Sequence, residues 1–307
     1  MLFNSSDISS LNVFRTIVEH GSFVSAQYSL NISQSAVSQH MVKLEDRLGF
    51  RLCHRGRAGF ALTEKGAEIY EHVRVLFQRL DEFSDTVGEM RDELTGRLSI
   101  GISDNIISDP HLPVPLALNR FLAQTRSVDV RLEVGVAADI EAKLLRGELS
   151  LTLTPAFSMD DRIVRRKVYD ERQVLCCGHL HPLFDVTRLT LDKIEDYPFV
   201  VRPYRDTNEL KIFQKAKVAA SASNVEAIAT FILSGCYLGY LPRCYAQRWL
   251  DSGQMRLLRE NETSYDVNFY LATRKNARES LILRTFMDEL LARIYDAAPL
   301  ANLRDAD

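Results

Sequence analysis

The sequence lacks long apolar runs and has few cysteines. No segment approaches the roughly 18 consecutive apolar residues that a membrane-spanning helix needs, and the first ten residues lack the basic and apolar regions of a secretory signal. Five cysteines are an odd number in a chain without an export signal. This favours reduced thiols over a disulfide framework, and we expect a cytoplasmic protein with no membrane partner.

Motifs of catalysis and cofactor binding are also absent from the sequence. It contains no Gly-x-Gly-x-x-Gly, no Walker sequence and no nucleophile elbow. Asp104, Ser108 and His111 lie close together in the sequence, but no base, orienting partner and oxyanion site line up with them. We therefore expect no catalytic residues, no cofactor and no enzymatic activity.

One group of residues resembles a metal site. Cys177, His179 and His181 would share a face of a strand, and Cys176 lies beside them. Cysteine is, however, a common core residue. We expect no metal here.

Composition and charge indicate a multi-domain globular protein. Hydrophobic residues make up 46% and charged residues 26%, which excludes collagen-like, mucin-like and disordered chains. The length of 307 residues suits about two domains, with room for a small third. Residues 1–66 carry seven Lys/Arg and five Asp/Glu, whereas the remainder carries 31 and 36. A mildly basic head on an acidic body favours a nucleic-acid-binding module joined to another domain.

Helix start and stop signals in the first 63 residues predict a helix-turn-helix followed by a hairpin. Glycine and asparagine suit helix ends, and serine suits helix starts. These signals are, in chain order, Gly21, Ser22, Asn31, Ser33 and Gly49. Residues 51–62 contain two glycines around a basic tip, which predicts a β-hairpin, or wing.

From residue 64 the pattern predicts a long helix with one narrow apolar seam. Apolar residues alternate at spacings of four and three, as in a coiled coil. The seam comprises Ile69, Val73, Leu76, Leu80, Phe83, Val87, Met90 and Leu94. The spacing favours pairing with the same helix of a second subunit. The alternative is an amphipathic helix that lies on its own domain.

After Gly96, strands and helices alternate. The predicted strands are residues 98–102, 128–134, 149–153, 173–177, 199–201 and 267–272, and the predicted helices are about 113–124, 138–147, 224–234, 243–250 and 280–294. This alternation predicts an α/β fold with mostly parallel sheets. The length suits two lobes with a ligand cleft beyond the strand ends.

The head and linker resemble LysR-type transcriptional regulators. The matching residues are Leu11, Phe14, Gly21-Ser22-Phe23, Ala26, Ser33-Gln34-Ser35-Ala36-Val37-Ser38-Gln39, Lys43-Leu44-Glu45, Leu48-Gly49, Leu52, Arg55 and Leu62-Thr63-Glu64-Lys65-Gly66. The resemblance covers residues 1–95 closely, and the rest more loosely through His181-Pro182-Leu183 and residues 234–242. This chain has Ser35 and Cys53 where the family usually has proline and phenylalanine.

The resemblance implies a multi-domain fold. Residues 1–63 would form a winged helix-turn-helix DNA-binding domain, with the helix-turn-helix at about 23–42, and residues 64–95 a linker and dimerisation helix. Residues 97–307 would form a two-lobed α/β effector domain like a periplasmic binding protein. Lobe I would comprise about 97–166 and 267–307, and lobe II about 167–266.

The resemblance also implies that the third helix enters the major groove of double-stranded DNA. Glutamine can pair bidentately with adenine, serine can contact base or phosphate, and wing arginines can neutralise phosphates or reach a minor groove. The expected DNA contacts are Ser33, Gln34, Ser35, Ser38, Gln39, Lys43, Arg51, Arg55 and Arg57. The alternative is that the polar residues of this helix, Gln34, Ser35, Ser38 and Gln39, simply form a solvated helix face.

In the family, a small co-inducer binds between the lobes and rearranges the oligomer on DNA. Carried over to this chain, the effector-binding residues would be Ser103, Asn105, Thr154, Arg202, Tyr204, Ser221 and Asn224. Helix N-termini, hydroxyls and arginine favour anions, so an anionic effector is favoured. The alternative for Arg202 is plain surface charge.

We therefore expect a DNA-binding regulator that forms a homodimer or tetramer, responds to a small molecule and contacts RNA polymerase. One alternative is a thiol-based redox sensor of the same family that uses Cys236 and Cys244, although two inert buried thiols are the simpler interpretation. A two-lobed small-molecule binding or transport protein and a cytosolic enzyme are the alternatives from other classes.

Overall fold

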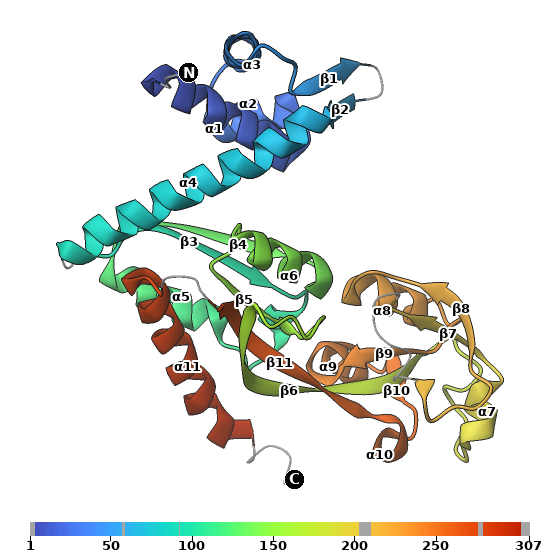
Figure 1. Ribbon diagram of the computed structural model, residues 1–307. Helices are drawn as coiled ribbons and strands as arrows, with labels where there is room; N and C mark the ends of the chain where they lie inside the picture. The colour runs from blue at the N-terminus through green and yellow to red at the C-terminus, as the bar shows by residue number, and fades with distance from the viewer. Residues whose placement is uncertain (1–3, 57–58, 92, 203–209, 276–278, 302–307) are drawn as a thin grey trace. The chain divides into compact units, whose positions relative to one another are not determined.

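The computed structural model describes residues 4–56, 59–91, 93–202, 210–275 and 279–301 (Figure 1). It divides into two compact units, the first ending at Val87 and the second beginning at Gly88. None of the helices formed by these residues has the length and apolarity that crossing a bilayer requires.

The first unit begins with three helices, α1 (Ser5–His20), α2 (Phe23–Leu30) and α3 (Gln34–Leu48). Ser22 and Ser33 cap α2 and α3, because each hydroxyl accepts a backbone N–H of the first helical turn. Gly21, Asn31 and Gly49 end the helices in the left-handed conformation, with φ of 63°, 51° and 79°. The predicted helix-turn-helix is confirmed down to these caps.

The predicted wing is also confirmed. Strands β1 (Cys53–Gly56) and β2 (Gly59–Leu62) pair antiparallel. Glu45 of α3 holds the root of this hairpin, since its carboxylate accepts the backbone N–H of Leu52 at 2.8 Å and of Cys53 at 3.3 Å. Cys53 itself is buried in the core of this unit.

Helix α4 (Glu64–Met90) follows, and the predicted seam does not run unbroken along it. Ile69 and Val73 pack against the core of the first unit, and Val73 is 4% exposed. Leu94 lies beyond the helix and packs against the core of the second unit. The expectation of one eight-residue dimerisation seam is therefore wrong at both ends, because these side chains complete their own domains.

The middle of the seam is not covered by the described residues of the first unit. Leu76 is 37% exposed, Leu80 42% and Phe83 66%. These three side chains, which we call the exposed seam, lie within two turns of α4. Met90, at the end of the helix, is 82% exposed.

The second unit contains a seven-stranded sheet with the order β10-β6-β11-β5-β3-β4, and β9 also pairs with β6. Its strands are β3 (Thr95–Ile102), β4 (Ser127–Val134), β5 (Leu151–Pro155), β6 (Ile163–Gly178), β9 (Gly239–Pro242), β10 (Met255–Leu257) and β11 (Tyr265–Arg274). A separate parallel pair consists of β7 (Pro198–Val201) and β8 (Lys217–Ser221).

The prediction of mostly parallel sheets is wrong. β3 pairs in parallel with β4 and β5, but β11 and β6 run antiparallel to each other and to every other strand they pair with. All the antiparallel pairs of this sheet contain β6 or β11.

The long strands β6 and β11 are shared by two lobes (Figure 1). In the first lobe, α5 (Val114–Gln124) and α11 (Leu281–Ala301) pack on β3 and β5, and Phe121 meets Phe286 edge to face. α6 (Ala137–Arg146) packs beside β5. The second lobe contains α7 (Leu191–Glu195), α8 (Val225–Leu233), α9 (Arg243–Asp251) and α10 (Glu260–Thr263). The β6–β11 register shifts once, between Phe269 and Tyr270.

Candidate functional site

The outer face of α3 is polar and accessible. Val37, Met41 and Leu44 bury the inner face of this helix in the core of the first unit. On the other side, Gln34, Ser35, Gln39 and Lys43 are exposed, and Ser38 is half-buried. The amphipathic pattern thus leaves the predicted base-reading side chains free of the core.

Two further predicted DNA contacts, Ser33 and Arg51, lie at the start of α3 and at the root of the wing. The Ser33 hydroxyl caps α3 by accepting the Ala36 N–H at 3.2 Å, and it lies 2.9 Å from the Ser35 hydroxyl. Arg51 is exposed at the root of the wing. Arg57 and the side chain of Arg55 lie outside the described residues.

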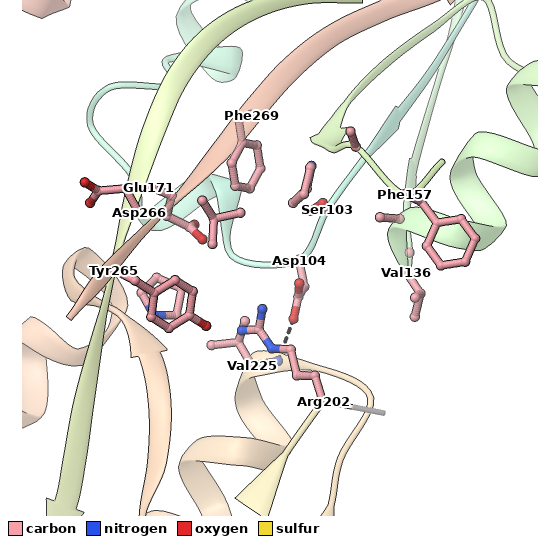
Figure 2. Close-up of a pocket in the computed structure, with 16 residues that line it drawn as sticks. Ser103, Asp104, Val136, Phe157, Glu171, Arg202, Val225, Tyr265, Asp266 and Phe269 are labelled. Carbon is pink, nitrogen blue, oxygen red and sulfur yellow. Dashed lines mark hydrogen bonds between the residues drawn. The ribbon is translucent and has the colours of Figure 1, made fainter. Parts of the chain in front are cut away.

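In the second unit, a cavity of about 590 Å³ lies between the lobes (Figure 2). The first lobe contributes the loop after β3, the start of α6 and the β5–β6 loop, and the second lobe contributes the ends of β7 and β9 and the start of α8. The lining residues are Ser103, Asp104, Gly135, Val136, Ala137, Pro155, Ala156, Phe157, Glu171, Arg202, Val225, Pro242, Tyr265, Asp266, Val267 and Phe269. We call it the interlobar cavity.

The structure brings only some of the predicted effector residues to this cavity. Ser103 and Arg202 line it, whereas Thr154 is buried one residue before the lining begins at Pro155. Asn105 and Asn224 line a neighbouring pocket of about 410 Å³. Ser221 is exposed on β8 and lines neither pocket, and Tyr204 lies outside the described residues.

The start of α8 is already occupied by protein groups. Asp104 accepts the Val225 N–H at 2.5 Å, and the Asn224 side chain accepts the Ala227 N–H at 2.8 Å. These bonds satisfy amides that an anion would otherwise bind. Asn224 therefore acts as the N-cap of α8, and two of the first amides of this helix are already hydrogen-bonded within the protein.

Arg202 differs from a surface arginine. Its side chain lines the interlobar cavity, the residue is only 6% exposed, and Nη2 is buried without a hydrogen-bond partner among the described residues. A buried guanidinium without an acceptor is costly, and its planar donors match a carboxylate. The alternative of plain surface charge is therefore wrong.

Glu171 on β6 is a lining residue that the sequence analysis missed. It is 5% exposed and accepts a hydrogen bond from Nε2 of Gln173, which lies on the same face of the strand. Its cross-strand neighbour is Val267, another lining residue. By contrast, Asp266 pairs at 3.1 Å with Arg172, and both side chains are about half exposed. Both Glu171 and Asp266 line the cavity, but Asp266 is also paired with Arg172.

A second missed feature fixes the β5–β6 loop. The buried carboxylate of Glu141 on α6 accepts the Phe157 N–H at 3.4 Å, the Ser158 hydroxyl and a guanidinium N–H of Arg165 at 2.8 Å. These bonds hold Phe157 against the cavity, where Figure 2 shows its ring beside Val136. In the sequence, Glu141 appeared only as a charged residue inside the predicted helix 138–147, which gave no sign of these bonds.

Cys236 and Cys244, the two thiols of the redox alternative, are both free. Burial, together with the Asp109 and Glu171 carboxylates, raises the pKa of the Cys244 thiol to about 12. Its Sγ donates to Asp109 at 3.6 Å. Cys236 is exposed, which corrects the expectation that both thiols are buried.

The other thiols are core residues. Cys176 and Cys177 are buried, and burial raises the pKa of Cys177 to about 12. Within the described part of the chain, no group of three His, Cys, Asp or Glu side chains has the arrangement needed to hold a metal ion.

A polar recognition helix with a wing and a two-lobed domain with a ligand-sized cavity define a DNA-binding regulator of the class that the sequence resembles. Two family models match: the bacterial regulatory helix-turn-helix protein of the lysR family over residues 8–67, and the LysR substrate binding domain over residues 91–294. The chain belongs to the LysR family of transcriptional regulators, which are DNA-binding proteins and not enzymes. This excludes the transport-protein and enzyme alternatives.

Similar proteins cover nearly the whole chain. It is 36% identical over 285 residues to the HTH-type transcriptional activator BauR of Pseudomonas aeruginosa, which spans 92% of this chain and 93% of BauR. CbnR in complex with its target DNA gives a TM-score of 0.62 at 20% identity and covers 93% of this chain and 99% of CbnR. The full-length virulence activator AphB of Vibrio cholerae gives 0.60 at 19%, with coverage of 92% and 98%. The two structures show a common fold.

Proposed function

We propose that this protein is a ligand-responsive regulator in which a small co-inducer, bound in the interlobar cavity, switches an oligomer on its operator. The observation that carries the ligand-responsive part is Arg202, a buried guanidinium that lines the cavity with Nη2 unpartnered among the described residues. An anionic group on the co-inducer would supply the missing acceptor.

For the DNA-binding part, α3 is the proposed recognition helix. Its exposed polar residues are free to meet base edges, because its apolar face is buried in the head. The proposed base contacts are Gln34, Ser35, Ser38 and Gln39, and the proposed phosphate contacts are Lys43, Arg51, Arg55 and Arg57. Ser33 serves mainly as the N-cap of α3.

Specific DNA binding needs two DNA-binding domains, because a single one contacts only a few base pairs. The exposed seam of α4 supports a homodimer, and linking two weak sites raises their effective concentration. Twofold symmetry then favours a pseudo-palindromic operator. We keep the division into residues 1–63, 64–95 and 97–307 as the proposed domains, with pairs of dimers as a further assembly.

The direction of regulation is proposed from the relatives. BauR, 36% identical to this chain, is a transcriptional activator. This supports activation, with RNA polymerase as a further partner in the cytoplasm. A redox mechanism has less support, because the raised pKa of Cys244 leaves little thiolate at neutral pH.

A gel-shift titration with DNA from upstream of the protein's own gene tests the DNA-binding part. Gln34→Ala should weaken binding to the operator about 10- to 100-fold and leave binding to unrelated DNA unchanged, because a bidentate base contact is lost. Gln254→Ala removes an exposed glutamine of the second unit and serves as the matched control. Equal binding by the Gln34→Ala and Gln254→Ala variants would contradict the assignment of α3.

A further inference from the structure

We infer that Val42 of α3 reads the 5-methyl group of a thymine in the operator. This inference rests on the proposed role of α3 as the recognition helix. It adds an apolar contact to the hydrogen bonds of the proposed interface, and it therefore names a feature of the DNA sequence that the protein prefers.

Val42 is an apolar residue on a polar surface. It is 50% exposed, and among the described residues of α3 it is the one large apolar side chain that is exposed. The apolar face of this helix, formed by Val37, Met41 and Leu44, is buried in the core of the first unit. Val42 therefore lies outside that core, although it directly follows Met41 in the chain.

The side chain of Val42 points in the direction of the proposed base contacts. These contacts are Gln34, Ser35, Ser38 and Gln39. Successive residues of an α-helix turn by about 100°, so Val42 points within about 10° of the mean direction of these four residues. Ser35, Ser38, Gln39 and Val42 also have the spacing i, i+3, i+4 and i+7. The base-reading residues of homeodomain recognition helices have the same spacing.

The position of Val42 along the helix agrees with its direction. It follows Gln39 by about 4.5 Å along the helix axis, so a helix whose first two turns enter the major groove brings Val42 to the adjoining bases. Lys43, the next residue, is exposed and is a proposed phosphate contact. The helix thus presents an apolar side chain between its base-reading residues and a phosphate contact.

The chemistry of the major groove selects thymine as the partner of this side chain. Among the groups that base pairs present there, the thymine methyl is apolar, whereas the others are hydrogen-bond donors and acceptors. A valine pressed against donors or acceptors removes them from water without offering a hydrogen bond, which is unfavourable. Against a thymine methyl, both apolar surfaces leave water together, which is favourable.

The test is a gel-shift titration of the full-length protein with DNA from upstream of its own gene. Footprinting first locates the operator, and each thymine in it is then replaced by uracil, which lacks only the 5-methyl group. At one position of each half-site, uracil should weaken binding of the wild-type protein about 3- to 5-fold, because the burial of one methyl group is lost. Uracil in both half-sites should weaken it about 10- to 20-fold.

Three variants connect the lost methyl group to Val42. Val42→Ser removes both γ-methyl groups at similar helix propensity, and it should lose the preference for thymine at the sensitive position. Gln34→Ala should weaken binding and keep this preference, because the methyl contact remains. Val164→Ser is the matched control, since Val164 is 52% exposed in the second unit, and it should keep wild-type affinity and preference.

Two outcomes would overturn the inference: the wild-type protein binds every uracil-substituted operator as tightly as the thymine operator, or Val42→Ser keeps the full preference for thymine at every sensitive position. Melting temperatures of the variants verify folding, and the uracil scan with the wild-type protein needs no variant. Failure to bind the upstream DNA refutes the proposed regulator. Specific binding that is indifferent to uracil refutes the thymine contact alone.

Discussion

Replacing Leu80 and Phe83 by alanine in the middle of α4 should dissociate the protein. Both side chains are exposed within the chain, so their truncation leaves the packing of a single protomer intact. In a dimer built on the exposed seam they would become buried.

The size of the effect follows from the area that pairing would bury. Leu80 is 42% exposed and Phe83 66%, so roughly half of each side chain is available to a partner. Full burial of such a side chain contributes about 1.5–3 kcal/mol, and half burial about 0.75–1.5 kcal/mol. Four truncated side chains per dimer then remove about 3–6 kcal/mol, which raises the dimer Kd by roughly two to four orders of magnitude.

Sedimentation velocity over a concentration series measures the dimer Kd, and thermal melting follows protomer stability. Asp81→Ala, in the same stretch of α4, is exposed and serves as the control that should leave the Kd unchanged. Val73→Ala should instead lower the stability of the first unit, because Val73 is packed in its core. A double alanine variant that dimerises like the wild type would refute the role of the exposed seam.

Three further predictions test single features. Ser33→Ala should lower the free energy of unfolding of the first unit by about 1 kcal/mol, because the cap of α3 is lost; an unchanged denaturation midpoint would argue against it. Iodoacetamide at pH 7–8 should label Cys236 well before Cys244, and Cys244 labelling should rise with pH, because its pKa is raised to about 12 and the thiol stays protonated below that value; mass spectrometry after digestion reads this out, and equal rates would count against the assigned environment. Phe286→Ala should destabilise the second unit by about 3–5 kcal/mol, since its ring is fully buried against Phe121; a loss under 1 kcal/mol in denaturant unfolding would contradict this packing.

The fold of the head was predictable because its signals are local. Ser22, Asn31, Ser33 and Gly49 each determine a helix end within a few residues, and the structure places a cap or a left-handed residue at every one. The order of strands in the second unit was not predictable in this way. Periodicity identifies a strand but says nothing of its partner or of the relative direction of the two strands.

For the seam of α4 and the cavity, too, local signals were readable in the sequence, but contacts between distant residues were not. An apolar side chain such as Val73 has the same spacing whether it faces its own domain or a second copy, so the pattern could not tell them apart. Arg202 and Ser103 were found from the resemblance. Glu171 was missed because the predicted strand began at residue 173, whereas β6 begins at Ile163 and so includes Glu171.

The two lobes share β6 and β11, so any change in the angle between the lobes has to be taken up by these two strands. The ladder between these strands runs from Tyr265 to Arg274, and any opening has to be absorbed as a change in its coiling. The ladder has one irregular point, next to Phe269, and such points concentrate twist. Because the Phe269 ring also lines the cavity, a ligand bound there would touch the strand pair beside its one irregular point.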